Sequence, residues 1–130
     1  MGVKNLTRDA MLTLCGVFNE GVSSFRGAAL SFPPDETGPA RDIAQQFQDA
    51  AALTHVAYED SAPGMLPGLD SQIGRLVTTL AGLTDPRLLQ AAEDVRFGEK
   101  VAYKNLGSQA RDDLGSYGRG IFGPGGNFSG

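Results

Sequence analysis

The clearest pattern of apolar and polar positions lies in the first quarter of the chain. Six apolar or small residues recur there at alternating spacings of four and three: Met11, Cys15, Phe18, Val22, Phe25 and Ala29. This spacing places them on one face of an α-helix. Thr7 is a suitable N-cap before the series, and Pro33 and Pro34 follow it, so we predict a helix over residues 7–30.

A second stripe of mostly small residues runs beside this face on the same predicted helix: Ala10, Val17, Gly21, Ser24 and Ala28. Leu14 lies between the two stripes. Small side chains let another backbone approach closely, so we expect this helix to meet two neighbours. Gly16, Gly21 and Gly27 each cost an isolated helix up to about 1 kcal/mol relative to alanine, which predicts that packing requires them or that the helix forms only with its neighbours.

Two further helices are predicted from apolar faces at helical spacing. One spans residues 39–59, with Pro39 at a favourable first position. Its apolar face consists of Ile43, Phe47, Ala50, Thr54 and Ala57. The other spans residues 69–81, after a loop with two prolines at 61–68, and Gly82 is suited to end it. Its apolar face consists of Leu69, Ile73, Leu76, Val77 and Leu80.

A fourth helix begins after Thr84-Asp85-Pro86, since a polar cap followed by proline in the first turn is a typical helix start. Its apolar positions are Leu88, Ala91, Ala92, Val95, Val101, Ala102 and Leu106. The pattern fades by Leu114, and Gly98 and Gly107 are positions where it could bend or divide. No segment alternates like a strand between hairpin turns. The sequence therefore predicts an all-α fold, a small bundle of about four helices with proline-marked loops, over residues 1–114.

Residues 115–130 form a separate, glycine-rich segment, which we call the C-terminal arm. Seven of its sixteen residues are glycine, yet four large apolar residues lie among them: Tyr117, Ile121, Phe122 and Phe128. A flexible linker is usually built from Gly and Ser without such groups. We therefore predict an extended arm that becomes ordered by docking onto another chain.

Composition and charge exclude several functions. The net charge of −4, with no basic block in any segment, argues against a nucleic-acid-binding surface. The single cysteine excludes an intramolecular disulfide. We find no signal-peptide pattern and no apolar stretch long enough to cross a bilayer. The expected location is a virion if the protein is viral and otherwise the cytoplasm, without secretion by a signal peptide.

Candidate catalytic and metal-binding residues are few. His55 and Glu59 form an i, i+4 pair that could supply two metal ligands, but zinc or iron requires at least a third, so a helix-flank histidine is the simpler interpretation. Cys15 lies in the apolar series and is expected to be a small buried residue rather than a reactive thiol. Glu99, with Lys100 and Lys104, is expected to form surface ion pairs. No catalytic residue, cofactor or metal is therefore predicted.

In overall profile the chain is similar to small structural proteins of tailed-bacteriophage particles, although no motif is shared. It is short, helical, acidic and poor in histidine, and it carries an aromatic-containing glycine arm. The similarity implies a non-enzymatic structural subunit of a large symmetric assembly, a virion component of the capsid, neck or tail. Its partners would be copies of itself or other structural proteins of that assembly, with no nucleic-acid specificity and no membrane. The alternative is a soluble cytoplasmic helical adaptor or regulator that binds one partner protein.

Two groups of residues are predicted to contact other chains. On the first helix they are Met11, Cys15, Phe18, Val22 and Phe25, although the same stripe is equally expected for the core of the chain's own bundle. On the arm they are Tyr117, Ile121, Phe122 and Phe128.

Overall fold

The computed structural model describes residues 8–59 and 66–107. Four α-helices make up nearly all of this part of the chain: α1 (Arg8–Ala29), α2 (Gly38–Glu59), α3 (Leu66–Ala81) and α4 (Pro86–Lys104). A short 3₁₀ helix, η1 (Pro34–Glu36), lies between α1 and α2. The described residues contain no strand, so the predicted all-α helical bundle is confirmed. The C-terminal arm lies outside the described residues.

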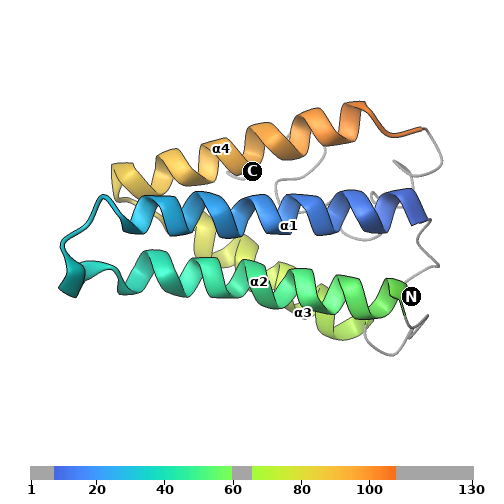
Figure 1. The fold of residues 1–130 in the computed structure, drawn as a ribbon, viewed down its shortest axis with the longest axis horizontal. Helices are drawn as coiled ribbons and strands as arrows, with labels where there is room; N and C mark the ends of the chain where they lie inside the picture. The colour runs from blue at the N-terminus through green and yellow to red at the C-terminus, as the bar shows by residue number, and fades with distance from the viewer. Residues whose placement is uncertain (1–7, 60–65, 108–130) are drawn as a thin grey trace.

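Helix α1 lies at the centre of the arrangement (Figure 1). It packs against α2 on one side and α4 on the other, and α2 also packs against α3. This agrees with the prediction that the first helix meets two neighbours. The α1–α2 connection and the start of α4 lie at one end of the bundle, and α4 ends at the other (Figure 1).

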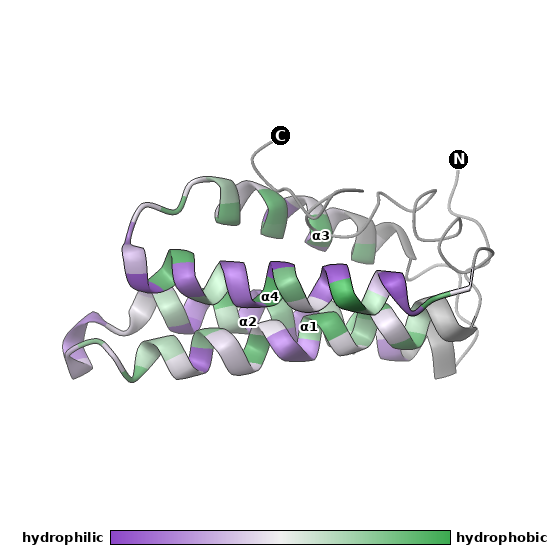
Figure 2. Cartoon of the chain, turned by 90° about the horizontal axis from the view of Figure 1, so that it is seen from above, coloured by the Kyte–Doolittle hydropathy of each residue, from purple (hydrophilic) through white to green (hydrophobic). Residues whose placement is uncertain are grey.

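The core is formed by the predicted apolar faces. Figure 2 shows that hydrophobic and hydrophilic positions alternate along each helix, as amphipathic helices in a bundle require. The largest fully buried apolar side chains come from all four helices: Phe18, Phe25, Phe47, Leu14, Leu69, Leu76, Leu80 and Val95. The rings of Phe25 and Phe47 stack with centroids 5.7 Å apart and an interplanar angle of 23°, which joins α1 to α2.

Two helix boundaries differ from the sequence prediction. Helix α3 begins at Leu66, three residues earlier than expected, because proline is tolerated in a first helical turn and Pro67 does not force a loop. Helix α4 runs without a break through Gly98 and ends at Lys104, well before Leu114. At its end the backbone N–H of Asn105 donates to the carbonyl of Ala102, and the backbone N–H of Leu106 donates to the carbonyl of Tyr103.

The start of α4 is as predicted. The Asp85 carboxylate accepts a hydrogen bond from the backbone N–H of Arg87 at 2.8 Å, and Pro86 occupies the first turn. Arg87 also bonds to Asp85 through its side chain, donates to the carbonyl of Ser31 at 3.2 Å, and lies over the ring of Phe32 at 3.8 Å. These contacts tie the α1–α2 connection to the start of α4. Within the described residues, no helix is long and apolar enough to span a bilayer.

Candidate interaction site

The first-helix residues that we predicted to contact other chains lie mainly inside this chain. Phe18 and Phe25 are fully buried and Met11 is 6 % exposed. Cys15 and Val22 are partly buried and pack against the same core. The stripe therefore forms the core of the chain's own bundle, the second of the two interpretations that the spacing allowed. The arm residues Tyr117, Ile121, Phe122 and Phe128 lie outside the described residues.

The Cys15 thiol is partly buried and packs against the core. Its Sγ lies 3.9 Å from the carbonyl oxygen of Ala51 on α2 and accepts a contact from the Asn19 side-chain amide at 3.7 Å. Burial raises the pKa of the Cys15 thiol, and the Asn19 contact opposes this only in part. A raised pKa lowers the thiolate fraction, so the site does not favour nucleophilic chemistry.

His55 is exposed on α2, and the side chain of Glu59 is outside what the structure describes. Among the described residues, no three His, Cys, Asp or Glu side chains come together in a metal-binding arrangement.

A buried acidic residue on α4 was missed from the sequence. Glu99 is 1 % exposed, so its predicted role in surface ion pairs is wrong. It lies four residues after the buried Val95 and continues the core-facing stripe, whereas Val101 lies off that stripe and is 40 % exposed. Burial, and secondarily the Glu99 charge, raise the pKa of Tyr103, whose hydroxyl is buried without a hydrogen-bond partner among the described residues. The spacing of four from Val95 was the signal that could have revealed Glu99.

In the described part of the chain, large exposed apolar side chains come from α4 and from the two ends of α1. On α4, Phe97 is 69 % exposed, and Val101 lies one turn further on the same face. On α1, Leu30 is 87 % exposed at the end of the helix, and Leu12 is 48 % exposed near its start. We call Phe97 and Val101 the α4 apolar pair. An adjacent pair of this kind is a candidate contact with another chain.

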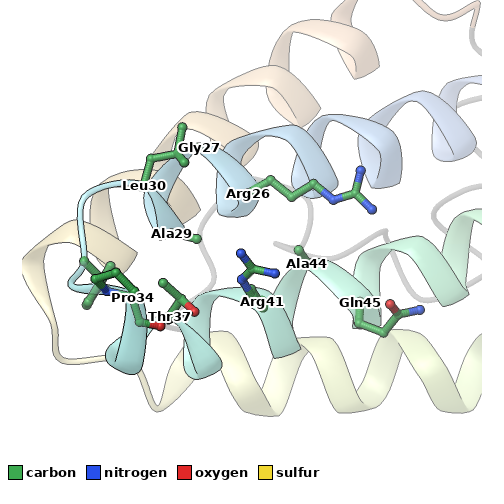
Figure 3. Close-up of a pocket in the computed structure, with 10 residues that line it drawn as sticks. Arg26, Gly27, Ala29, Leu30, Pro34, Thr37, Arg41, Ala44 and Gln45 are labelled. Carbon is green, nitrogen blue, oxygen red and sulfur yellow. Dashed lines mark hydrogen bonds between the residues drawn. The ribbon is translucent and has the colours of Figure 1, made fainter.

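A groove of about 720 Å³ lies between the end of α1 and the first half of α2 (Figure 3). Its lining consists of Arg26, Gly27, Ala29, Leu30, Phe32, Pro34, Thr37, Arg41, Ala44 and Gln45. Ala29 and Ala44 are buried, and their small side chains leave the space between the helices open. We call this feature the α1–α2 groove. Its volume lies within the range of about 300–1,000 Å³ that is common for binding pockets.

The groove is both apolar and cationic. Arg26 comes from α1 and Arg41 from α2, and Figure 3 shows both beside the space between these helices. Arg26 donates to the Oε1 atom of Gln48 at 2.8 Å, which is a neutral partner. By contrast, Arg87 pairs with Asp85 and Arg96 pairs with Glu93. Within the described residues, neither groove guanidinium group forms an ion pair with a carboxylate at 4 Å or less.

Comparisons with protein-family models, curated proteins and solved structures found no match to this chain. The described surface itself carries two candidate contact sites, the α4 apolar pair and the α1–α2 groove.

Proposed function

We propose that this protein is a non-enzymatic structural subunit of a large symmetric assembly, a component of a bacteriophage virion (capsid, neck or tail). Its partners are copies of itself or other structural proteins of the same particle. The helical bundle supplies a rigid body, and the C-terminal arm connects it to a neighbour.

The exposure of Phe97 is the observation that carries this proposal. Complete burial of a phenylalanine that is 69 % exposed contributes about 1–2 kcal/mol, and Val101 extends the same surface along α4. The helix α4 already packs on α1 through its opposite side, with Leu88, Ala92 and Val95 buried. The α4 apolar pair is therefore available for contact with a second body.

The apolar stripe of α1, from Met11 to Phe25, packs in the core and is therefore not available for contacts between subunits. Since Phe18 and Phe25 are buried within the chain, contacts between subunits fall to the exposed residues at its two ends, Leu12 and Leu30. Leu30 lines the α1–α2 groove. Together with the arm, these positions give the body several contact points, as a subunit with more than one neighbour requires.

Ordering the arm costs conformational entropy, which the burial of Tyr117, Ile121, Phe122 and Phe128 must exceed. The many glycines of the arm would let it follow the surface of a neighbour, because glycine adopts backbone angles that other residues avoid. The arm thus acts as a connector only when a neighbour supplies apolar pockets.

Light scattering on the full-length protein, next to a version that ends at Leu114, tests the proposal. We expect a large, discrete oligomer for the full-length protein and a smaller species for the truncated one. The helical circular dichroism signal per molecule should be the same for both, because the truncation leaves the four helices intact. If the full-length and the truncated protein are both monomeric, the proposal is contradicted. That result would favour the alternative, a cytoplasmic adaptor that binds one different partner protein.

A further inference from the structure

On the basis of the proposed function, we propose that the outer face of α4 is a contact between two copies of this chain that are related by a two-fold axis. In this pairing the two α4 helices are antiparallel, and Phe97 of one copy packs against Phe97 of the other. Glu93 of each copy lies beside Lys100 and Lys104 of the other copy.

The outer face of α4 lies opposite the residues that pack in the core. Helix α4 is at the edge of the bundle, beside α1 (Figure 1). Its buried stripe includes Leu88, Val95 and Glu99, and the side chains on the opposite side of the helix are all exposed. These outer residues are Glu93, Asp94, Phe97, Lys100, Val101 and Lys104.

The charges on the outer face are divided between its two halves. Two acidic residues precede Phe97, whereas Lys100 and Lys104 follow it. Within one helix, a side chain meets the residues three and four positions away, and for both lysines these positions hold no acidic residue. Neither lysine forms an ion pair within the part of the chain that the structure describes. A carboxylate for these lysines must therefore come from another helix.

The helix dipole does not account for this division of charge. Acidic side chains stabilise the first turn of a helix and basic side chains the last turn, and the effect falls off beyond these turns. The first turn of α4 has no acidic residue, and Glu93 and Asp94 lie about two turns after Pro86. Lys104 lies in the last turn, but Lys100 lies before it. An antiparallel partner helix, in contrast, requires acidic and basic residues on opposite sides of a central position.

A two-fold axis at Phe97 brings the opposite charges together. Glu93 and Lys100 are seven residues apart, so they share one edge of the outer face, and the axis places this edge against its own copy. Glu93 is four positions before Phe97 and Lys100 is three positions after it, so their levels in the pair differ by about 1.5 Å. Lys104 of the other copy lies about one turn further along, on the far side of Glu93.

The outer face is thus complementary to itself, as a closed two-fold contact requires. A parallel pairing would instead place like charges side by side. Glu93 also accepts a hydrogen bond from Arg96 of its own helix at 2.7 Å. Its side chain is 47 % exposed, and a carboxylate can accept several hydrogen bonds, so a lysine of the other copy can bind it as well.

Charge reversal in the full-length protein tests the pairing. Glu93→Lys and Lys100→Glu each place like charges together at two symmetric positions. We expect each variant to associate about tenfold more weakly than the wild type or worse. An equimolar mixture of the two variants should restore association, as should both changes in one chain. Asp42→Lys on α2 and Arg75→Glu on α3, which are exposed and outside this face, are the matched controls for net charge. Association that is unchanged in both reversals overturns the pairing.

Cysteine cross-linking under mild oxidation, in a Cys15→Ala background, tests the direction of the two helices. Gln90 and Lys104 are exposed and lie seven positions before and after Phe97. An antiparallel pair should form a disulfide-linked dimer when Gln90→Cys and Lys104→Cys are mixed, and not with either variant alone. Dimers of each variant alone would show parallel helices. Those dimers, or the absence of any cross-link, would overturn the pairing.

The mass of the wild type in light scattering separates this pairing from the proposed function. A large oligomer that yields no cross-link and ignores both charge reversals overturns the pairing and leaves the proposed function standing. A wild type that forms only a dimer, weakened by each reversal, supports the pairing and overturns the large assembly. A monomeric wild type without a cross-link overturns both.

Discussion

The ring of Phe47 on α2 lies against the backbone of Gly21 on α1, in the space that a Cβ atom at position 21 would need. Three Phe47 ring atoms, Cδ1, Cγ and Cε1, would be closer to that Cβ than any normal contact allows. Since Phe47 is fully buried and stacks on Phe25, its ring has little room to move. The absence of a side chain at Gly21 thus determines how closely α1 and α2 approach.

Gly21→Ala should therefore destabilise the bundle, even though alanine favours a helix. Overpacking of a filled core costs about 1–3 kcal/mol, which exceeds the gain in helix propensity of up to about 1 kcal/mol. Urea unfolding followed by circular dichroism measures the change.

Gly16→Ala is the matched control on the same helix. Apart from the backbone of α1 itself and the two neighbouring residues, no atom of the described residues lies within 4 Å of a Cβ at position 16. Only the propensity gain therefore remains, and the free energy of unfolding should rise by up to about 1 kcal/mol. Gly98→Ala should cost less than Gly21→Ala, because the three atoms nearest to its Cβ would belong to the flexible end of the exposed Glu20 side chain. Equal effects of the Gly21 and Gly16 variants would refute this account of the α1–α2 contact.

Asp85 is expected to make stability depend on pH in the acid range. Its hydrogen bonds with Arg87, first through the side chain and then through the backbone, hold the pKa of the carboxyl below its ordinary value of 3.8. A lowered pKa in the folded state means that the contribution is fully present above about pH 4. It is lost as the pH falls through the folded-state pKa.

Asp85→Ala should lower the thermal midpoint at neutral pH, because the first turn of α4 loses its cap. Asp85→Asn should retain most of the stability, since asparagine also accepts the backbone hydrogen bond, but it should lose this part of the pH dependence. Thermal unfolding between neutral and acid pH compares the three proteins. Identical pH profiles for wild type and Asp85→Asn would contradict the assigned role.

Tyr103→Phe should stabilise the protein. The hydroxyl group is buried without a hydrogen-bond partner among the described residues, and an unsatisfied buried polar group costs about 1–3 kcal/mol. We expect a gain of about 1 kcal/mol in urea unfolding. A loss of stability would show that the hydroxyl has a partner beyond residues 8–59 and 66–107.

Tyr103 should also make the stability of the protein depend on pH in the alkaline range. Burial, and then the Glu99 charge, raise the pKa of Tyr103 above its ordinary value of 10.0. The free energy of unfolding is therefore independent of this group below about pH 10 and falls as the pH rises from there toward the folded-state pKa, since the unfolded chain ionises first. Tyr103→Phe should remove this decrease, which alkaline unfolding curves measure.

Cys15 is expected to react slowly with thiol reagents. Its raised pKa and its contact with Ala51 reduce both the thiolate fraction and the access of a reagent. Alkylation at neutral pH should be at least several-fold slower than for the unfolded protein in urea. Asn19→Ala should slow it further, because the Asn19 hydrogen bond favours the thiolate. Equal rates for folded and unfolded protein would contradict the partly buried position.

Phe97→Ser tests the α4 apolar pair. The side chain is mostly exposed, so thermal stability should change by less than about 0.5 kcal/mol, while the mass in light scattering should fall. Arg75→Ser, at an exposed position on α3, is the control and should leave the mass unchanged. If the mass of the oligomer is unchanged in Phe97→Ser, the α4 apolar pair is not a contact between subunits.

The sequence by itself determined the helices and much of the core. The four-three spacing from Met11 to Ala29 predicted α1 to within a residue at each end, and Asp85-Pro86 located the start of α4. These features are local: helical periodicity and capping depend on residues within a few positions of one another. The end of α4 at Lys104 and the early start of α3 were not predicted, since helix ends depend on packing as well as on propensity.

Only the tertiary structure decided which faces meet. An apolar stripe that includes Phe18 and Phe25 has the same spacing whether it packs within one chain or between two. Helical periodicity shows which face is apolar, but not which element packs against it. The requirement for Gly21, but not for Gly16, became clear only with Phe47 opposite it. The α1–α2 groove likewise depends on Arg26 and Arg41, which are distant in sequence and come together because two helices pack side by side. Spacing along one helix carries no information about such a juxtaposition.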